Sequence, residues 1–283
     1  MPMKEIASNI YASTDFPGVN VGFVVLPAGA IAVDAPTLPH DAHAWRKQIE
    51  ETAGGPILYV VLTDAHPDRL LSAGLLEAPI VAARGGYDRA AAYTDGFWRG
   101  VVDSWGRRYP EAADKLPEVS IALPEIMFST SITLHKGGAD VTVRHVAGAG
   151  PGSAWLHLHK QDVLFAGDTV ITDSHPFLHA SPDTKAWLNT LTALRRARFA
   201  ETTIVPGRGS LCSQDDTRQI SDYVALARRR ARSMHAAGEE ADVAAVVTEM
   251  LPLFPFPDDE REQVMRRIKA GIEQVYEELG QGE

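Results

Sequence analysis

The chain has 283 residues, of which 45% are hydrophobic and 23% are charged. These are ordinary values for a globular protein, and they exclude extended disorder. Asp and Glu number 37 against 27 Lys and Arg, a formal charge of −10, so neither a nucleic-acid duplex nor an anionic membrane is an expected partner. The single cysteine, Cys212, excludes an internal disulfide and a thiolate-rich zinc site, but ten histidines leave an imidazole metal site open.

The first 17 residues contain no apolar core of signal-peptide length. No run in the chain approaches the roughly 18 apolar residues that cross a bilayer. We therefore expect a cytoplasmic protein with no membrane partner. A homodimer is an open expectation, since apolar helical stripes and an aromatic insertion could exceed what one chain buries.

Apolar, β-branched runs separated by turn residues predict strands along most of the chain, with helices between them. The run ILYVVL is unbroken and predicts a strand covered on both faces. Residues 84–127 carry aromatic residues among scattered charges and predict a helical insertion. The predicted strands are Val19–Leu26, Ala30–Asp34, Ile57–Leu62, Pro79–Ala83, Ile132–Leu134, Val141–Val146, Ala154–Leu158, Val163–Ala166 and Thr202–Val205. The predicted helices are His40–Ala53, Thr184–Phe199 and three amphipathic helices after Ser213.

Common nucleotide and hydrolase motifs are missing from the sequence. The loop Gly148–Ser153 lacks the third glycine of a dinucleotide-binding loop, and a strand rather than a helix is predicted after it. No Gly-Lys-Ser/Thr sequence predicts a P-loop, and no Gly-x-Ser-x-Gly sequence predicts a nucleophile elbow.

Four short motifs occur in order, each at the end of a predicted strand. They are TDAHPDR at 63–69, VAGAGPGS at 146–153, LFAGDT at 164–169 and IVPGRG at 204–209. They resemble the signature elements of the metallo-β-lactamase superfamily, namely Thr-His-x-His-x-Asp-His, Pro-Gly-His-x-Pro-Gly-Ser, the Gly-Asp turn and Val-Pro-Gly-His-Gly. The opening strand pair ending in Val33-Asp34 also resembles the family, and the C-terminal helices resemble its glyoxalase II-like hydrolases.

The resemblance covers nearly the whole chain and implies an α/β fold. The expected architecture is an αββα four-layer sandwich of two mixed β-sheets over residues 1–211. Residues 212–283 are expected to form a C-terminal helical extension that packs on the same domain. The functional site is expected at one edge of the sandwich.

The departures from the family pattern fall on the metal ligands. Members of the family usually bind two zinc or iron ions through five histidines and two aspartates. The matching positions here hold Asp64, His66 and Ala149 at the first site, Asp68, Arg69 and Arg208 at the second, and Asp168 as the bridging carboxylate. Three of the seven keep the family's residue, and two of the replaced histidines are arginines.

Arginine cannot replace histidine as a ligand, because its guanidinium stays protonated and offers donors but no lone pair. Asp64, Asp68 and Asp168 contribute three negative charges, and Arg69 and Arg208 contribute two positive charges. The set is therefore nearly neutral without a metal. We predict a degenerate metal site with no cofactor, in which the two arginines occupy the metal positions and form ion pairs with the aspartates.

The predicted function is a pocket for a small, anionic ligand. Its expected ligand-binding residues are Asp64, Arg69, Arg208 and His175. His175 and His179 both follow the Gly-Asp turn, where the resemblance places the family's pocket.

Two alternatives stay open at this stage. The first is a hydrolase of esters, thioesters or lactams, with His66, Asp68 and Asp168 as candidate catalytic residues. Together with Asp64 they could hold one divalent ion that activates water; manganese, iron or magnesium suits this oxygen-rich set better than zinc. Without metal, a histidine or aspartate base and an arginine could perform the same reaction. The second alternative is a non-catalytic scaffold or interaction protein.

Overall fold

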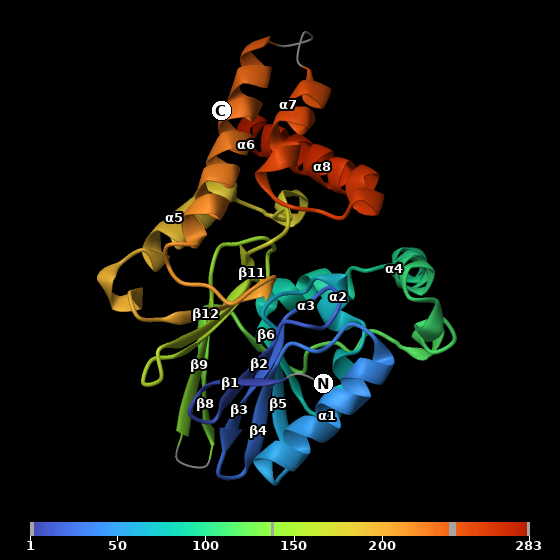
Figure 1. Ribbon diagram of the computed structural model, residues 1–283, viewed down its shortest axis with the longest axis vertical. Coiled ribbons are helices and arrows are strands. Elements are labelled where there is room, and N and C mark those ends of the chain that lie inside the picture. Colours follow the sequence, from blue (N-terminus) through green and yellow to red (C-terminus); the bar gives the residue numbers. More distant parts are fainter. Residues whose placement is uncertain (1–2, 137–138, 238–241, 282–283) are drawn as a thin grey trace.

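Two β-sheets lie face to face and helices cover their outer faces, as Figure 1 shows for the computed structural model of residues 3–136, 139–237 and 242–281. This arrangement confirms the predicted αββα sandwich of two mixed sheets. The C-terminal helices lie at one end of the sandwich (Figure 1), which agrees with the predicted helical extension.

The first sheet has seven strands, and their order in the sheet is their order in the chain. Its first four strands are antiparallel, and the pairs from β4 to β7 are parallel. The strands are β1 (Lys4–Ala7), β2 (Ile10–Ser13), β3 (Val21–Leu26), β4 (Gly29–Val33), β5 (Ile57–Val61), β6 (Ile80–Ala83) and β7 (Ile126–Phe128).

The second sheet has five strands in the order β12-β11-β10-β9-β8, and only β11 and β12 run parallel. Its strands are β8 (Ser131–Lys136), β9 (Ala139–His145), β10 (Ala154–Leu158), β11 (Val163–Ile171) and β12 (Thr203–Arg208). Apolar side chains from the facing sides of both sheets form one buried cluster, with Ile31 and Val61 from the first and Leu156 and Phe165 from the second.

The helices form the two outer layers. Helix α1 packs on the outer face of the first sheet through Trp45 and Ile49, which are fully buried. Helices α5 to α8 share a second core with β11 and β12, in which Trp187 is fully buried. The helices are α1 (Pro39–Ala53), α2 (Pro67–Leu70), α3 (Arg84–Ala91), α4 (Asp95–Arg108), α5 (Thr184–Leu194), α6 (Thr217–Ala237), α7 (Val243–Met250) and α8 (Arg261–Gly280). Because this core is continuous, the division at residue 211 stays a prediction.

Two elements differ most from the prediction in length. Strand β11 continues to Ile171 instead of ending at Ala166, and all nine of its residues are buried. Helix α5 ends at Leu194, five residues earlier than predicted. The chain then makes a 3₁₀ turn that places Phe199 edge-on against Trp155, so burial of this aromatic ring outweighs continuation of the helix.

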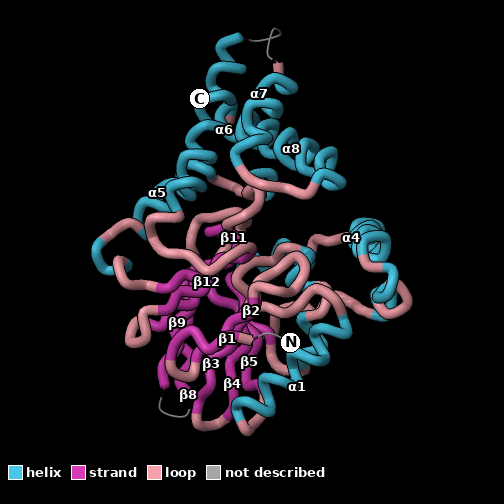
Figure 2. The backbone as a smooth tube through the Cα atoms, in the orientation of Figure 1, coloured by secondary structure: helices cyan, strands magenta, loops and turns pink. Residues whose placement is uncertain are grey.

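The fold brings one set of strand ends to a single edge. Strands β4 and β5 are parallel, and so are β11 and β12, so each pair presents its carboxyl ends together. Figure 2 shows the loops that follow them gathered between the strands and the C-terminal helices. All four motif segments lie here, which makes this edge the place to look for a site.

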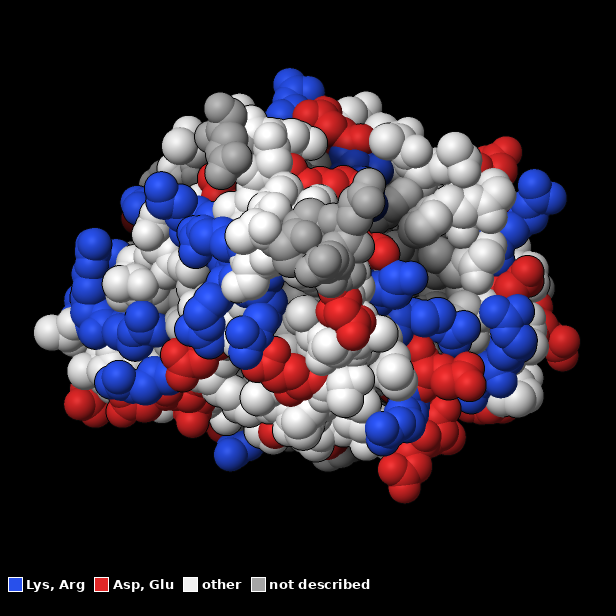
Figure 3. Space-filling view, turned by 90° about the horizontal axis from the view of Figure 1, so that it is seen from above, with Lys and Arg blue, Asp and Glu red and all other residues white. Residues whose placement is uncertain are grey.

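The upper face, seen in Figure 3, mixes charges of both signs. Basic and acidic side chains lie next to one another over much of it, so the acidic excess of the chain is not concentrated on this face. No helix in the described part of the chain is long and apolar enough to cross a membrane.

Candidate functional site

Arg69, on the short helix α2, is the centre of the site and is fully buried. Each of its three nitrogen atoms donates to an oxygen on a surrounding strand end or loop. Nε donates to Asp34 Oδ2 (3.0 Å) and Thr63 Oγ1 (3.1 Å), Nη1 to Asp64 Oδ1 (3.4 Å), and Nη2 to Asp168 Oδ1 (2.7 Å) and the Gly207 carbonyl (3.3 Å). The first three acceptors follow strands of the first sheet and the last two lie on strands of the second, so one guanidinium connects both sheets.

Asp34, which directly follows β4, completes this centre. It has a left-handed backbone (φ 57°), which aspartate tolerates better than most residues. Its carboxylate accepts the Thr63 backbone N–H (2.9 Å) and hydroxyl (2.6 Å) as well as Arg69 Nε. Burial raises the pKa of Asp34 to about 6 against the opposing effect of Arg69, so the group is mostly ionised at neutral pH.

Arg208, at the end of β12, forms the second ion-pair centre. Its Nε lies 3.2 Å from Asp168 Oδ2, and its Nη1 donates to Asp68 Oδ2 (2.8 Å). Asp68 also accepts the indole N–H of Trp105 from α4 (2.9 Å). Burial acts to raise the pKa of Asp68 and of Asp168, but the adjacent cations outweigh it and hold both pKa values far below the usual range.

The neighbours of His66 favour one position for its ring proton. Arg208 Nη2 lies 3.1 Å from His66 Nδ1, and the Asp68 backbone N–H points at the same atom from 3.3 Å. One acceptor, Asp68 Oδ2, also lies 3.3 Å from Nδ1, but it is already paired with Arg208. The two donors favour the tautomer that accepts at Nδ1 and carries a proton on Nε2. Nε2 makes no hydrogen bond to any residue that the structure describes, so in this tautomer it is a free donor.

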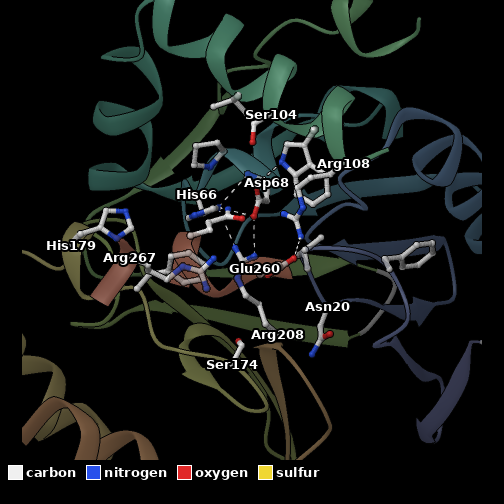
Figure 4. A pocket seen from close by; sticks show the side chains of 18 of the residues that line it. Asn20, His66, Asp68, Ser104, Arg108, Ser174, His179, Arg208, Glu260 and Arg267 are labelled. Atoms are coloured by element: carbon white, nitrogen blue, oxygen red, sulfur yellow. Dashed lines mark hydrogen bonds and ion pairs between the residues drawn. The ribbon is translucent and has the colours of Figure 1, made fainter. Parts of the chain in front are cut away.

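Two cavities adjoin these side chains. The main cavity, about 810 Å³, extends between α4 and α8, and His66, Asp68, Arg208 and Arg267 line it. In Figure 4, Arg267 and His179 lie on one side of the Arg208–Asp68 pair and Asn20 lies on the other.

The inner cavity has a volume of about 230 Å³. Asp64, His66, Ala149 and Asp168 line it, so four of the seven positions matched to the family's ligands meet there. His66, Phe177 and His179 line both cavities and therefore stand between them.

These residues do not fit the two-metal centre that the family motif implies. Asp168, in the bridging position, already accepts from both guanidiniums, and the Asp64 carboxylate accepts the His66 backbone N–H (2.7 Å) and Arg69 Nη1. A dication about 4 Å from one guanidinium would be repelled by on the order of 8 kcal/mol at an effective dielectric constant of ~20. Among the described residues, no three His, Cys, Asp or Glu side chains converge as metal ligands.

The structure changes the predicted charge balance of the site. The sequence analysis counted three carboxylates and omitted Asp34. The structure therefore has four carboxylates beside the two guanidiniums of Arg69 and Arg208, and the net charge of this group is −2 when all are ionised. The main cavity holds a further cation, Arg267 on α8, whose guanidinium lies 4.3 Å from the centre of the Phe177 ring. Arg208 lies 4.5 Å from the same ring, so the two cations are close.

Two of the predicted ligand-binding residues are out of a ligand's reach. Arg69 has no exposed surface, and protein oxygens occupy its donors, so its role is to connect buried groups. His175 is also buried, with Nε2 at 3.1 Å from the Leu251 carbonyl and Nδ1 at 3.3 Å from the Tyr223 hydroxyl. It lines neither cavity, because the chain turns after β11 and directs this ring into the core beneath the C-terminal helices.

His179 takes the place that was predicted for His175. It lines both cavities, and burial lowers its pKa to about 4, so the ring is neutral at physiological pH. Sequence reasoning missed Asp34 and Arg267 as site residues. Only Asp34 had a local signal, since it ends a predicted strand beside the family's opening motif.

Replacing Arg69 with methionine tests its role as the connection between the sheets. Arg69→Met leaves Asp34, Asp64 and Asp168 buried without their common partner, so the free energy of unfolding should fall by about 3–5 kcal/mol. Arg69→Lys should recover little of it, since one ammonium cannot reach acceptors on four sides. Urea denaturation measures both variants, and a loss below about 1 kcal/mol in Arg69→Met would contradict this role.

The buried His175 predicts a pH dependence of stability. Burial lowers its pKa to about 4, against about 6.5 in an unfolded chain. Between these values the unfolded state binds more protons, so stability is lost as pH falls from about 6.5 to 4. Denaturation from pH 7.5 to 4 should show a loss about 2 kcal/mol smaller in His175→Gln than in the native chain. An unchanged slope in His175→Gln would contradict the prediction.

Comparisons with known proteins show which family model and which solved structures this chain is similar to. The metallo-β-lactamase superfamily model matches residues 14–208. A β-lactamase domain protein from Burkholderia ambifaria is similar over 99% of this chain and 89% of its own (TM-score 0.69, 19% identity). A metallo-β-lactamase family protein from Thermus thermophilus is similar over 98% and 95% (TM-score 0.67, 16% identity). The inverting sec-alkylsulfatase Pisa1 from Pseudomonas sp. is similar over 97% of this chain and 49% of its own (TM-score 0.70, 14% identity).

At these identities the solved structures support the fold alone. No curated protein matches the sequence. The family model covers more than half of the chain, and the two sheets and four motifs agree with it. The chain belongs to the metallo-β-lactamase superfamily.

Proposed function

We propose that this protein is a metal-independent member of its superfamily whose main cavity binds a small anion. Arg69 and Arg208 take the place of metal ions in holding the aspartates together. Arg267, His66 and His179 present their polar groups to the ligand. The observation that carries the proposal is a guanidinium in a large cavity, Arg267, that has no ion-pair partner within the described residues.

The carboxylates of the site are poor candidates for acid–base chemistry. Asp68 and Asp168 have pKa values far below the usual range, so each is a weak base at neutral pH. In the tautomer that its neighbouring donors favour, His66 carries a proton on Nε2 and offers the cavity a donor instead of a lone pair. This arrangement supports hydrogen-bond donation to a bound anion over activation of water.

The charges on the wall of the main cavity favour an anion. The three carboxylates that line it already have partners. Asp68 forms an ion pair with Arg208, and Glu260 forms one with Arg108 (2.7 Å). Asp173 accepts hydrogen bonds from the Ser210 backbone N–H and hydroxyl. Arg267 is the remaining cation. Burial and the nearby Arg208 lower its pKa, which indicates that its charge is poorly compensated, and a bound anion would relieve this.

The metal-independent part of the proposal is tested by elemental analysis. Protein purified without chelator and dialysed should hold far less than one zinc, iron, manganese or magnesium ion per chain. The variant Asp64→His/Arg69→His/Ala149→His/Arg208→His restores five histidines beside two aspartates and should take up zinc. Arg208→His alone is the control and should take up none, since Arg69 remains. A stoichiometric metal in the native protein that survives dialysis would contradict the proposal.

The anion-binding part is tested by thermal shift with acetate, sulfate and phosphate, using chloride as the reference at constant ionic strength. At least one probe should raise the melting temperature of the native protein. Arg267→Gln should weaken its binding by about 10- to 100-fold, as expected for loss of charge-assisted hydrogen bonds. Arg266→Gln removes the same charge from an exposed neighbour on α8 and should bind normally. Equal binding by both variants, or no binding of any probe, would refute the site.

A further inference from the structure

The main cavity has an apolar wall opposite its free cation. Helix α4 contributes Phe97, Val101 and Trp105 to this wall. Phe97 is 44% exposed, and one of its faces stacks on Tyr93 with 4.5 Å between the ring centres. An exposed aromatic ring beside a large cavity is typical of a surface that meets a ligand.

Small residues on α4 leave space in front of this wall. Gly96, Gly100 and Ser104 follow one another at intervals of four residues, and all three line the main cavity. A Cβ atom added at Gly100 would meet no atom within 4 Å, and its backbone does not have the positive φ that favours glycine. Glycine inside a helix costs about 1 kcal/mol relative to alanine. No contact in the described part of the chain explains that cost, but an occupant of the cavity would.

Contacts at one end hold α4 in place across the cavity from α8. Trp105 donates its indole N–H to Asp68, and Arg108 pairs with Glu260 just before α8 begins. Figure 4 shows Ser104 on one side of the Asp68–Arg208 pair and Arg267 on another. A ligand whose charged group binds Arg267 can therefore extend along the open face of α4.

We propose that the ligand is an amphipathic monoanion, with one carboxylate or sulfate group carried on an apolar body. The head binds Arg267 and the Nε2–H of His66, and the body lies along α4 beside Gly100. A single charge is inferred because Arg267 is the one unpaired guanidinium among the described residues lining this cavity. Asp68, Asp173 and Glu260 on the same wall would repel a second negative charge. This inference rests on the proposed anion site and specifies its ligand.

Calorimetric titration with straight-chain carboxylates from acetate to decanoate, and with alkyl sulfates of equal length, tests the inference below micelle-forming concentrations. Each added methylene should tighten Kd by about threefold to fourfold until the wall is covered. Alcohols of equal length, which lack the charge, should bind far more weakly. Alkyl phosphates, dianionic at pH 8, should bind more weakly than the sulfates.

Two variants separate the head from the body. Arg267→Gln should weaken every anion by a similar factor and keep the dependence on chain length. Gly100→Leu fills open space on an exposed helix, so it should fold, bind acetate normally and no longer distinguish long chains from short ones. Arg99→Leu, on α4 but outside the cavity, should behave as the native protein.

The outcomes distinguish the two proposals. Binding of short anions through Arg267 with no gain on lengthening the chain, or an unaffected Gly100→Leu, would overturn the amphipathic ligand and leave the anion site standing. Tighter binding of the dianionic phosphates than of the sulfates would overturn the single charge. No binding of any anion, short or long, would overturn the proposed function itself.

Discussion

The buried guanidinium of Arg69 is the constraint on which the edge of the sandwich depends. It lies where loops from both sheets converge, and it satisfies oxygens on β11, on β12 and after β4 and β5. The three buried carboxylates of Asp34, Asp64 and Asp168 would repel one another without this shared cation. Its planar fork of donors reaches acceptors on several sides at once, which a lysine ammonium cannot do. The two sheets are therefore held together here by an arginine, in a place where the family motif implies metal.

This constraint also limits the chemistry that the site can perform. The cations that fix Asp68 and Asp168 lower the pKa values of both groups, so the carboxylates are stable ion-pair partners and weak bases. Arg208 donates toward the Nδ1 side of His66, which favours an N–H directed at the cavity. The features that stabilise the edge thus favour donors on the cavity wall. Together with Arg267, which is unpaired among the described residues, such donors support the proposed binding of an anion more than its hydrolysis.

The sequence predicted the part of the site that lies within motifs. Each motif lies at the end of a predicted strand, so the fold could be anticipated from the order of the motifs. The same order predicts that Asp64, His66, Asp68, Arg69, Asp168 and Arg208 meet. Asp34 was missed because a carboxylate 35 residues before Arg69 gives no signal of contact until the strands are paired. Arg267 was missed for a stronger reason, since α8 is about 200 residues from α2 and its amphipathic pattern fixes only its buried face. His175 was misplaced because proximity to the Gly-Asp turn does not determine which way the chain leaves it.

The same network indicates why partial restoration of the metal site is unfavourable. Arg69→His alone would leave Asp34 and Asp64 without their cation, and Arg208→His would release Asp68 while Arg69 still repels an incoming ion. Each single change therefore incurs the cost of an unpaired buried charge before a metal can bind, and the changes are strongly coupled because they share Asp168. Zinc binding is accordingly expected only when both guanidiniums are replaced together. Until then the ion-pair network and a metal centre exclude each other, because both require the carboxylate of Asp168.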